Sequence, residues 1–523
     1  MDRARAGNLL AMSVRVRFAP SPTGLLHVGA LRDALFKYLF ARHCGGQNIL
    51  RIEDTDRSRY NPDSEREFIE TLRWVGIEFD EGPHVGGPCA PYRQSERKEA
   101  GIYEPYVRRL LEEGHAYKAF DTPEELAAMR EHQVANKLPV GYFGGEWRDA
   151  PPSKVEAAER AGRPYVIRQR IPRGQRIVVD DVIRGRIEWD SDQIDDPVLI
   201  KADGMPTYHF AAMVDDHLMG ITHILRGEEW ISSAPKHAVL FDMFGWERPV
   251  FVHCPVIVGN DGKKLSKRHG ATRVLDYMAQ GFLPAALKNF IALIGWSPGD
   301  DREGMTEQEL IEAFTLEGLQ PSPGRFDIEK LRWLNGWHIR RLTVPEFVDA
   351  FQSYAREPYV AEYWTQVAEP QPDAARKAAE IARMARAVAQ DRDYAERFFA
   401  LAQERTTVLA DLPDVCGFFL DGEPPIDPKA AAKWLTQPHV PELLQFLLQN
   451  LTQMTSEEEC EALLRQYAER AGFEKLGPVV HPTRVALTGK TAGPGLFELM
   501  AVLGPERMAP RLRRALEIVR SGS

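Results

Sequence analysis

A proline- and glycine-rich loop near the N-terminus carries side chains that could bind a phosphate group. It runs Arg17-Phe-Ala-Pro-Ser-Pro-Thr-Gly-Leu-Leu-His27-Val-Gly29-Ala and follows a short strand predicted at residues 14–18. A helix predicted at residues 29–44 places unsatisfied backbone N–H groups at the end of this loop, where they attract anions. His27 can donate a hydrogen bond to a phosphate oxygen, and Gly29 lets a nucleotide approach the backbone closely. The alternative is a turn followed by a capped helix that binds no ligand.

A second group of polar side chains lies in the run Lys264-Leu-Ser-Lys-Arg268, which contains three cations and a hydroxyl group. Gly259 and Gly262 precede it and favour a flexible loop that could close over a polyphosphate. The cations could then stabilise a departing pyrophosphate. An isolated basic loop is more often a solvated surface loop, so this alternative stays open for the segment taken alone.

The elements that must position these two loops predict an α/β fold. In the helix at residues 29–44, apolar side chains recur with the spacing of a buried helical face. Together with strands at residues 14–18 and 48–52, this helix forms one βαβ unit, the seed of a doubly wound parallel sheet. After about residue 332 the strand signals fade and the sequence predicts helices. Short β runs between the two parts indicate an insertion, at residues 165–171, 176–183, 186–189 and 198–201.

Length and composition exclude several classes of protein. The 523 residues suggest roughly three to five domains. No stretch has the length of about 18 apolar residues that a membrane helix needs. Residues 1–12 lack the apolar region of a secretory signal and resemble a loose leader. The five cysteines form no Cys-x-x-Cys pair, so we expect no metal site, no disulfide framework and a reducing cytoplasmic location. The net charge of −10 argues weakly against nucleic-acid binding, because 66 Lys and Arg residues still allow a local basic surface.

Together the two loops resemble the two signature motifs of the class I aminoacyl-tRNA synthetases. The usual forms are His-Ile-Gly-His and Lys-Met-Ser-Lys-Ser, and the forms with Ala30 and Arg268 are typical of the glutamyl branch. The chain therefore resembles the bacterial glutamyl-tRNA synthetases over essentially residues 13–520. Further stretches carry the same resemblance, at residues 51–57, 91–97, 206–210, 214–219, 226–230, 326–336 and 484–489.

The resemblance implies a role for individual residues. Those expected to contact glutamate are Arg17, Ser21, Glu53, Tyr208 and Arg226. Those expected to bind ATP are His27, Gly29, Lys264, Ser266, Lys267 and Arg268, of which His27, Gly29, Lys264 and Lys267 are expected to be catalytic. The residue chemistry agrees, because arginine is the natural bidentate partner of a carboxylate, and Glu53 follows a strand and could hold an ammonium group. The alternative for each glutamate contact is a structural ion pair, and for Glu53 also a capped helix start.

The resemblance also implies the architecture: a Rossmann-like doubly wound parallel sheet with an inserted α+β acceptor-binding domain, followed by all-helical anticodon-binding domains. We expect the two halves of the catalytic domain at residues 13–116 and 206–262 and the insertion at residues 117–205. A stem-contact domain with the basic loop is expected at residues 263–332, and two helical domains at residues 333–430 and 431–523.

The activity that the resemblance implies is the ATP-dependent attachment of L-glutamate to tRNA(Glu) through a glutamyl-adenylate. The expected enzyme is a cytoplasmic monomer that uses ATP with Mg²⁺. Some relatives bind zinc through cysteines near the start of the insertion, but residues 117–121 contain none, so we expect no zinc. Some relatives also carry Asn where this chain has Ala212, so that contact is expected to be lost or replaced by water. Charging of tRNA(Gln) as well stays open.

Three rival interpretations are weaker. A glutaminyl-tRNA synthetase typically has Pro-Glu-Pro-Asn-Gly where this chain has Pro20-Ser-Pro-Thr-Gly24, and it ends in β-barrels rather than helices. A truncated paralogue that glutamylates a modified base lacks the C-terminal half. A non-catalytic tRNA-binding scaffold would have no need of His27, Gly29, Lys264 and Lys267.

We predict that Lys267→Ala slows adenylate formation by about 10²–10³-fold and leaves tRNA binding nearly unchanged, because its charge matters most when pyrophosphate departs. Single-turnover adenylate formation with saturating tRNA, glutamate and ATP measures the first effect, and filter binding measures the second. A chemical step within about threefold of the wild-type rate would remove Lys267 from the catalytic residues.

Overall fold

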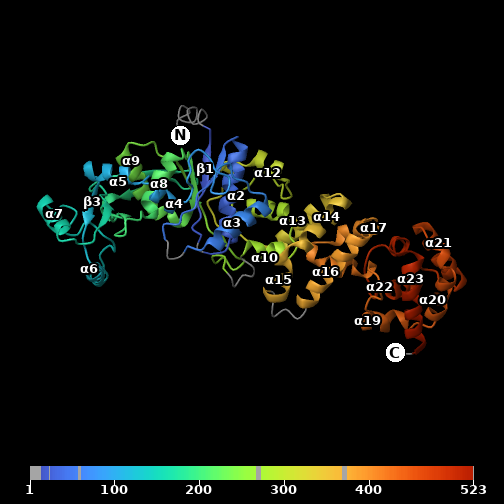
Figure 1. Ribbon diagram of the computed structural model, residues 1–523. Coiled ribbons are helices and arrows are strands. Elements are labelled where there is room, and N and C mark those ends of the chain that lie inside the picture. The colour runs from blue at the N-terminus through green and yellow to red at the C-terminus, as the bar shows by residue number, and fades with distance from the viewer. Residues whose placement is uncertain (1–12, 23, 57–59, 267–272, 368–373, 522–523) are drawn as a thin grey trace. The chain divides into compact units, whose positions relative to one another are not determined.

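The computed structural model describes residues 13–22, 24–56, 60–266, 273–367 and 374–521 (Figure 1). Lys267 and Arg268, both predicted to bind ATP, lie outside the described residues. The chain divides into two compact units. The first comprises Met1–Val274 with Lys288–Asp327, and the second comprises Leu275–Leu287 with Ile328–Ser523.

Parallel strands form the centre of the first unit. Strand β1 (Arg15–Phe18) pairs in parallel with β2 (Gln47–Leu50), and α2 (Val28–His43) connects them, which confirms the predicted βαβ unit. On its other side β1 lies next to β8 (His223–Gly227), where Thr222 N donates to Arg15 O at 2.9 Å. Strand β8 pairs in parallel with β9 (Val250–Cys254). These strands confirm the predicted Rossmann-like fold.

Helix α2 is buried on almost all sides rather than on the single face that its apolar spacing predicted. The buried residues include the expected Leu31 and Leu35, but also Phe36 and the charged Arg32 and Lys37. The guanidinium of Arg32 donates to the carbonyl oxygen of Pro255, and Lys37 pairs with Asp33 one turn earlier. Polar partners therefore let a charged helix face pack inside the protein.

The strands predicted for the insertion form, but they belong to two sheets. Strands β3 (Ala116–Ala119), β4 (Val166–Gln169) and β7 (Val198–Ile200) make an antiparallel sheet. The hairpin of β5 (Arg176–Asp181) and β6 (Gly185–Asp190) joins β9 instead, with Asp181 opposite Phe251 in a parallel pair. The resulting strand order is β6-β5-β9-β8.

A buried carboxylate organises the irregular part of the predicted insertion. Asp196 is fully buried and accepts hydrogen bonds from Tyr117 at 2.7 Å, Arg148 at 2.7 Å and Arg173 at 2.9 Å. Two helices pack in this region, α6 (Pro123–Ala135) and α7 (Pro152–Arg160). Thr122 and Glu125 form a capping box that begins α6.

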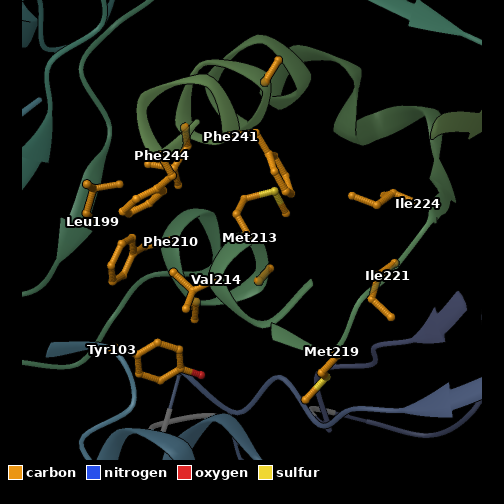
Figure 2. Packing of buried hydrophobic residues seen from close by; sticks show 14 of the residues in the cluster. Tyr103, Leu199, Phe210, Met213, Val214, Met219, Ile221, Ile224, Phe241 and Phe244 are labelled. Atoms are coloured by element: carbon orange, nitrogen blue, oxygen red, sulfur yellow. The ribbon is translucent and has the colours of Figure 1, made fainter. Parts of the chain in front are cut away.

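The hydrophobic core of the first unit lies around α8 (Tyr208–Leu218) and α9 (Ala234–Phe244). Figure 2 shows Phe210, Met213 and Val214 of α8 close to Phe241 and Phe244 of α9. The core also includes the ring of Tyr103, whose hydroxyl donates to Asp215 at 2.9 Å. Burial of these side chains fixes α8, which also carries the buried carboxylates Asp215 and Asp216.

The first unit also contains two short strands, β10 (Ile257–Val258) and β11 (Gly324–Arg325), which pair in parallel. Its other helices are α3 (Pro62–Val75), α4 (Gln94–Glu99), α5 (Glu104–Glu112), α12 (Glu307–Ala313) and the short η1 (Ser191–Gln193), η2 (Glu228–Ser233) and η4 (Leu316–Gly318). Helices α10 (Val274–Ala279) and α11 (Pro284–Ala292) contain two of the three chain positions at which the units are divided, and the third lies between Asp327 and Ile328.

The described part of the second unit is helical, as the sequence predicted. Its longer helices are α13 (Ile328–Arg341), α14 (Val344–Arg356), α16 (Ala374–Gln390), α17 (Arg392–Ala402), α20 (Val440–Gln449), α21 (Glu457–Arg470), α22 (Gly477–Thr488) and α23 (Leu496–Ser521). Shorter helical segments are α15 (Pro358–Glu362), η5 (Tyr363–Val367), η6 (Gln403–Arg405), η7 (Leu409–Asp411), α18 (Leu412–Cys416), η8 (Gly417–Phe419), α19 (Pro428–Ala430), η9 (Ala431–Leu435) and η10 (Leu451–Gln453).

Helix capping and aromatic packing between helices stabilise this helical unit. Capping boxes begin α14 and α21, through Thr343 with Glu346 and Ser456 with Glu459. The buried ring of Phe399 on α17 contacts Phe347 on α14, with ring centroids 5.1 Å apart. No helix within the described ranges combines the length and apolar character needed to cross a membrane.

We predict that Asp215→Ala lowers the local stability of the first unit by about 3–5 kcal/mol, because it leaves a buried guanidinium without its carboxylate. Asp215 is fully buried and pairs with Arg97 at 2.7 Å. Hydrogen exchange of the α8 amides at increasing urea measures this loss on the full chain. The matched control is Glu113→Ala, which breaks an exposed pair with Arg109 and should cost less than about 1 kcal/mol. Equal costs for the two variants would contradict the prediction.

Candidate active site

A cavity of about 1190 Å³ opens in the first unit where the strands end and α2 begins. It brings together nine of the residues that the sequence selected, which lie far apart along the chain. They are Arg17, Ser21, His27, Gly29, Glu53, Tyr208, Arg226, Lys264 and Ser266. The remaining two, Lys267 and Arg268, fall outside the described residues.

His27 is the N-cap of α2, and this capping contact determines its tautomer. The Nδ1 atom of His27 accepts a hydrogen bond from the backbone N–H of Ala30 at 3.2 Å. In a neutral imidazole the proton must then be on Nε2, where it can be donated to a ligand in the cavity. The first turn of α2 adds the positive end of the helix dipole at the same place.

Gly29 is needed because it lies beside the ring of His27. A Cβ atom at position 29 would lie 3.1 Å from both Cε1 and Nδ1 of that ring. A side chain would therefore displace the imidazole or break the cap to Ala30. The sequence predicted close approach of a ligand at Gly29, and the structure adds this requirement from within the protein.

Lys264 reaches the cavity from a tight hairpin. Gly259 and Gly262 make the turn, in which Gly262 N donates to Gly259 O at 3.0 Å and Gly262 has a φ of +72°. Lys264 pairs with Val258 across the hairpin. The charge of Lys264 acts on His27: partial burial lowers the pKa of His27, and the nearby Lys264 ammonium lowers it further. His27 is therefore neutral at pH 7, the state that its capping contact requires.

A buried ion-pair network holds Arg17 and Glu53 at another wall of the cavity. Arg17 Nε and Arg51 Nη1 donate to the same oxygen of Asp216, at 2.9 and 2.7 Å. Burial alone would raise the pKa of Asp216, but the two guanidinium groups outweigh it and lower the pKa. Arg51 also donates to Glu53 Oε1 at 2.8 Å. Glu53 therefore forms the ion pair that was the alternative to a glutamate contact, and it also lines the cavity.

The chain around Glu53 does not begin a helix. Residues 53–56 have no regular secondary structure, and α3 starts only at Pro62, so a capped helix start at Glu53 is excluded. The Ser21 hydroxyl donates to the backbone oxygen of Glu53 at 3.0 Å and links the two loops. Burial raises the pKa of Glu53, and Arg51 and Arg17 lower it without cancelling that effect.

Arg226 differs from Arg17 in its hydrogen-bond partners. It is 5% exposed and lies in β8, where its Nε and Nη1 atoms donate to the imidazoles of His253 and His237, both at 2.9 Å. None of these hydrogen bonds goes to a carboxylate, and Nη2 has no partner among the described residues. Burial lowers the pKa of Arg226, whereas Asp216 outweighs burial and raises the pKa of Arg17.

The ring of Tyr208 lies at the start of α8, close to Arg226. It packs against Trp230, with centroids 4.3 Å apart, and both rings line the cavity. The sequence selected Tyr208, but assigned no role to Trp230, His237, His253 or Asp216. Trp230 and Asp216 lie in stretches that carried the family resemblance; the two histidines lie outside these stretches, and no local motif marks them.

No group of three or more His, Cys, Asp or Glu side chains in the described part of the chain could hold a metal ion. The absence of zinc stays a prediction. All five cysteines are unpaired.

Comparison with known proteins gives the family. Residues 13–333 match the family described as tRNA synthetases class I (E and Q), catalytic domain, and residues 346–516 match an anticodon binding domain. The chain is 43% identical over 512 residues to the glutamate–tRNA ligase of Roseiflexus castenholzii, covering 97% of this chain and 96% of that one. It is 42% identical over 509 residues to the glutamate–tRNA ligase of Thermus thermophilus, covering 96% and 100%.

A solved structure supports the same assignment. The chain is similar to the glutamate tRNA ligase of Elizabethkingia meningosepticum, whose crystal structure is described as a complex with its amino acid. The TM-score is 0.84 at 36% identity, covering 97% of this chain and 100% of that one. The likeness therefore extends through both units.

We predict that Lys264→Met raises the pKa of His27, because it removes the cation that disfavours a charged imidazole, but leaves it below the ordinary value, because burial remains. NMR titration of histidine-labelled protein measures this, with His27→Gln to assign the signal. Lys154→Met is the matched control, since it removes a lysine on the surface helix α7. An unchanged His27 pKa in Lys264→Met would contradict the electrostatic coupling.

Proposed function

The chain belongs to the class I tRNA synthetases of the glutamate and glutamine type, and we propose that its cavity joins L-glutamate to ATP before transfer to tRNA(Glu). The enzyme is a glutamate–tRNA ligase that works in two steps. The α-carboxylate of glutamate attacks the α-phosphorus of ATP, which gives glutamyl-adenylate and pyrophosphate. The 2′-hydroxyl of the terminal tRNA adenosine then accepts the glutamyl group.

The observation that carries the assignment of the glutamate site is the unpaired charge of Arg226. A buried guanidinium is costly without an anion, and this one is held only by neutral acceptors. A carboxylate of the substrate would complete it through the unpartnered Nη2 atom. A carboxamide would leave the charge uncompensated, so the same feature favours glutamate over glutamine.

We assign the γ-carboxylate to Arg226, because the α-carboxylate must act as a nucleophile. A carboxylate paired with a buried guanidinium loses nucleophilicity, and its negative charge disappears when the mixed anhydride forms. The γ-carboxylate keeps its charge throughout, so its ion pair is retained in both steps. The hydroxyl of Tyr208 lies next to Arg226 and could add a hydrogen bond.

The remaining glutamate contacts follow from the same cavity. Glu53 supplies a carboxylate for the ammonium group, and a bound ammonium would favour its ionised form despite the burial that raises its pKa. Arg17 uses Nε for Asp216 and Nη1 for the backbone oxygen of Leu225, so its Nη2 atom is the one that could reach a ligand. Ser21 keeps the loop of Glu53 against the first loop through its hydrogen bond to the backbone.

The ATP end of the cavity is proposed at the N-terminus of α2. His27 donates from Nε2 to a phosphate oxygen as charge builds there, and Gly29 keeps the ring in place. Lys264 adds a cation close to His27. Ser266 completes this wall, and Lys267 and Arg268 are proposed to act with it. The Mg²⁺ that we propose enters with ATP as part of that substrate.

The two rival interpretations that imply a different enzymatic activity are less well supported. The glutaminyl branch was expected to end in β-barrels, whereas the described second unit is helical. The truncated paralogue lacks the C-terminal half, whereas residues 346–516 match an anticodon binding domain.

We propose tRNA(Glu) as the partner of the anticodon binding domain. We also propose that the enzyme is a monomer in the cytoplasm and binds no zinc. The five unpaired cysteines support a reducing location.

We predict that Arg226→Ala raises the KM for glutamate and leaves the KM for ATP nearly unchanged. Loss of a buried charged hydrogen bond costs about 2–5 kcal/mol, which corresponds to an increase of roughly 30-fold or more. Initial rates of aminoacylation with each substrate varied in turn measure both constants. Equal effects on the two substrates would mean that Arg226 is structural.

The charge-retaining control is Arg226→Lys. It keeps a cation but loses the planar fork that reaches His237, His253 and a ligand together, so its effect on glutamate should lie between wild type and alanine. Glutamine tested as a competitor separates charge from shape, because it should gain relative to glutamate only in the alanine variant.

A further inference from the structure

The environment of Arg226 is built from imidazoles that lie outside the residues assigned to the substrate. His253 on β9 accepts from Nε, and His237 on α9 accepts from Nη1. Both imidazoles are fully buried. Two of the three nitrogens of the guanidinium are therefore fixed by neutral rings on two different elements, and the third has no partner among the described residues.

Arginine can only donate hydrogen bonds, and this fixes the tautomers of both rings. His253 must accept at Nε2, so its proton is on Nδ1, 2.7 Å from Asp181 Oδ2. His237 must accept at Nδ1, so its proton is on Nε2, 3.0 Å from His209 Nδ1. The hydrogen bonds run outward from Arg226 in two directions, and each ring has one defined donor and one defined acceptor.

Asp181 is held in place by donors on every side. Its Oδ1 accepts from the backbone N–H groups of Ile183 and Arg184 at 3.0 and 2.9 Å. Its Oδ2 accepts from the backbone N–H and from Nδ1 of His253, at 3.0 and 2.7 Å. Asp181 belongs to β5, opposite Phe251 of β9, so strand pairing sets its position. Position 181 thus requires a group with two acceptor oxygens.

The protonation states agree with this geometry. Burial lowers the pKa of His237 well below its usual range, and Arg226 lowers it further. Burial lowers the pKa of His253, which Asp181 only partly offsets. His209 has a pKa of about 4, mainly because of burial. Burial would raise the pKa of Asp181, but the hydrogen bonds from His253 and the backbone outweigh it. At pH 7 the rings are neutral and Asp181 is ionised.

We propose that His237 and His253, with Asp181 behind His253, are positioning residues that orient the guanidinium of Arg226 toward the γ-carboxylate of glutamate. This inference rests on the proposed role of Arg226 in glutamate binding. Neutral acceptors suit this task, because they fix the fork without supplying a negative charge that would compete with the substrate. A carboxylate in place of either ring would orient Arg226 equally well but would neutralise it.

The test uses pairs of variants of the full-length enzyme that differ only in whether an acceptor remains. His253→Met removes the acceptor for Nε, and His253→Gln keeps an oxygen at a similar reach. His237→Leu removes the acceptor for Nη1, and His237→Asn keeps an oxygen close to the position of Nδ1. Asp181→Asn must turn one N–H toward existing donors, either the two backbone N–H groups or His253.

We expect His253→Met and His237→Leu to raise the KM for glutamate by about 10- to 100-fold, the effect of misplacing a binding group by about 1 Å. The KM for ATP and the affinity for tRNA should stay within about twofold of the wild-type values, because ATP and tRNA are proposed to bind away from these histidines. The Gln and Asn variants should recover to within about threefold of wild type. Asp181→Asn should raise the ratio of the KM for glutamate to the KM for ATP by about as much as His253→Met does.

Arg226→Ala is measured in parallel, so that two different failures can be separated. If Arg226→Ala leaves the KM for glutamate unchanged, the proposed function of Arg226 is wrong. If Arg226→Ala raises it but the acceptor-removing and acceptor-keeping variants behave alike, the positioning role of the imidazoles is wrong. Equal losses for glutamate and ATP would mean that the histidines only support the fold, which also overturns the inference. Thermal melting identifies any variant that fails to fold. If the variants at one histidine fail to fold, the KM values of the variants at the other histidine decide.

Discussion

Two adjacent buried carboxylates on α8 are the constraint on which the arrangement of the cavity depends. Asp215 and Asp216 are both fully buried, and a buried carboxylate stays ionised only when cations or hydrogen-bond donors surround it. Successive residues on a helix point about 100° apart, so the two face different partners. Asp216 meets Arg17 and Arg51 at the strand ends, and Asp215 meets Arg97. The pairs of Asp216 join α8 to the strand ends and the pair of Asp215 joins it to α4, so these buried charges are fixed before any ligand binds.

The same wall contains a charge that is oriented but not neutralised. Arg17 and Arg51 share Asp216, which raises the pKa of both, whereas the hydrogen bonds of Arg226 to other described residues go to imidazoles. The protein therefore separates two tasks that arginine can perform. The ion pairs of Arg17 and Arg51 hold the architecture, and Arg226, whose partners are neutral, is proposed to attract a substrate carboxylate. Preorganisation of this kind reduces the ordering that binding itself must supply.

The phosphate end of the cavity depends on a more local constraint. His27 is both the cap of α2 and the donor proposed for ATP, because one ring nitrogen accepts from Ala30 and the other carries the proton. Gly29 leaves room for that ring. A helix terminus, a tautomer and a proposed anion site thus depend on His27, Gly29 and Ala30, which lie within four consecutive positions.

The sequence by itself determined what depends on near neighbours. It predicted the strand, helix and strand around α2 and the helical second unit, because apolar spacing acts within a few positions. It also selected nine described residues that line one cavity, through a family resemblance carried by two motifs about 240 residues apart and by further stretches between them. Only the tertiary structure decided the partners of Arg226. Asp181, His237 and His253 come from three elements, and a histidine becomes a neutral acceptor only when folding buries it beside a particular donor.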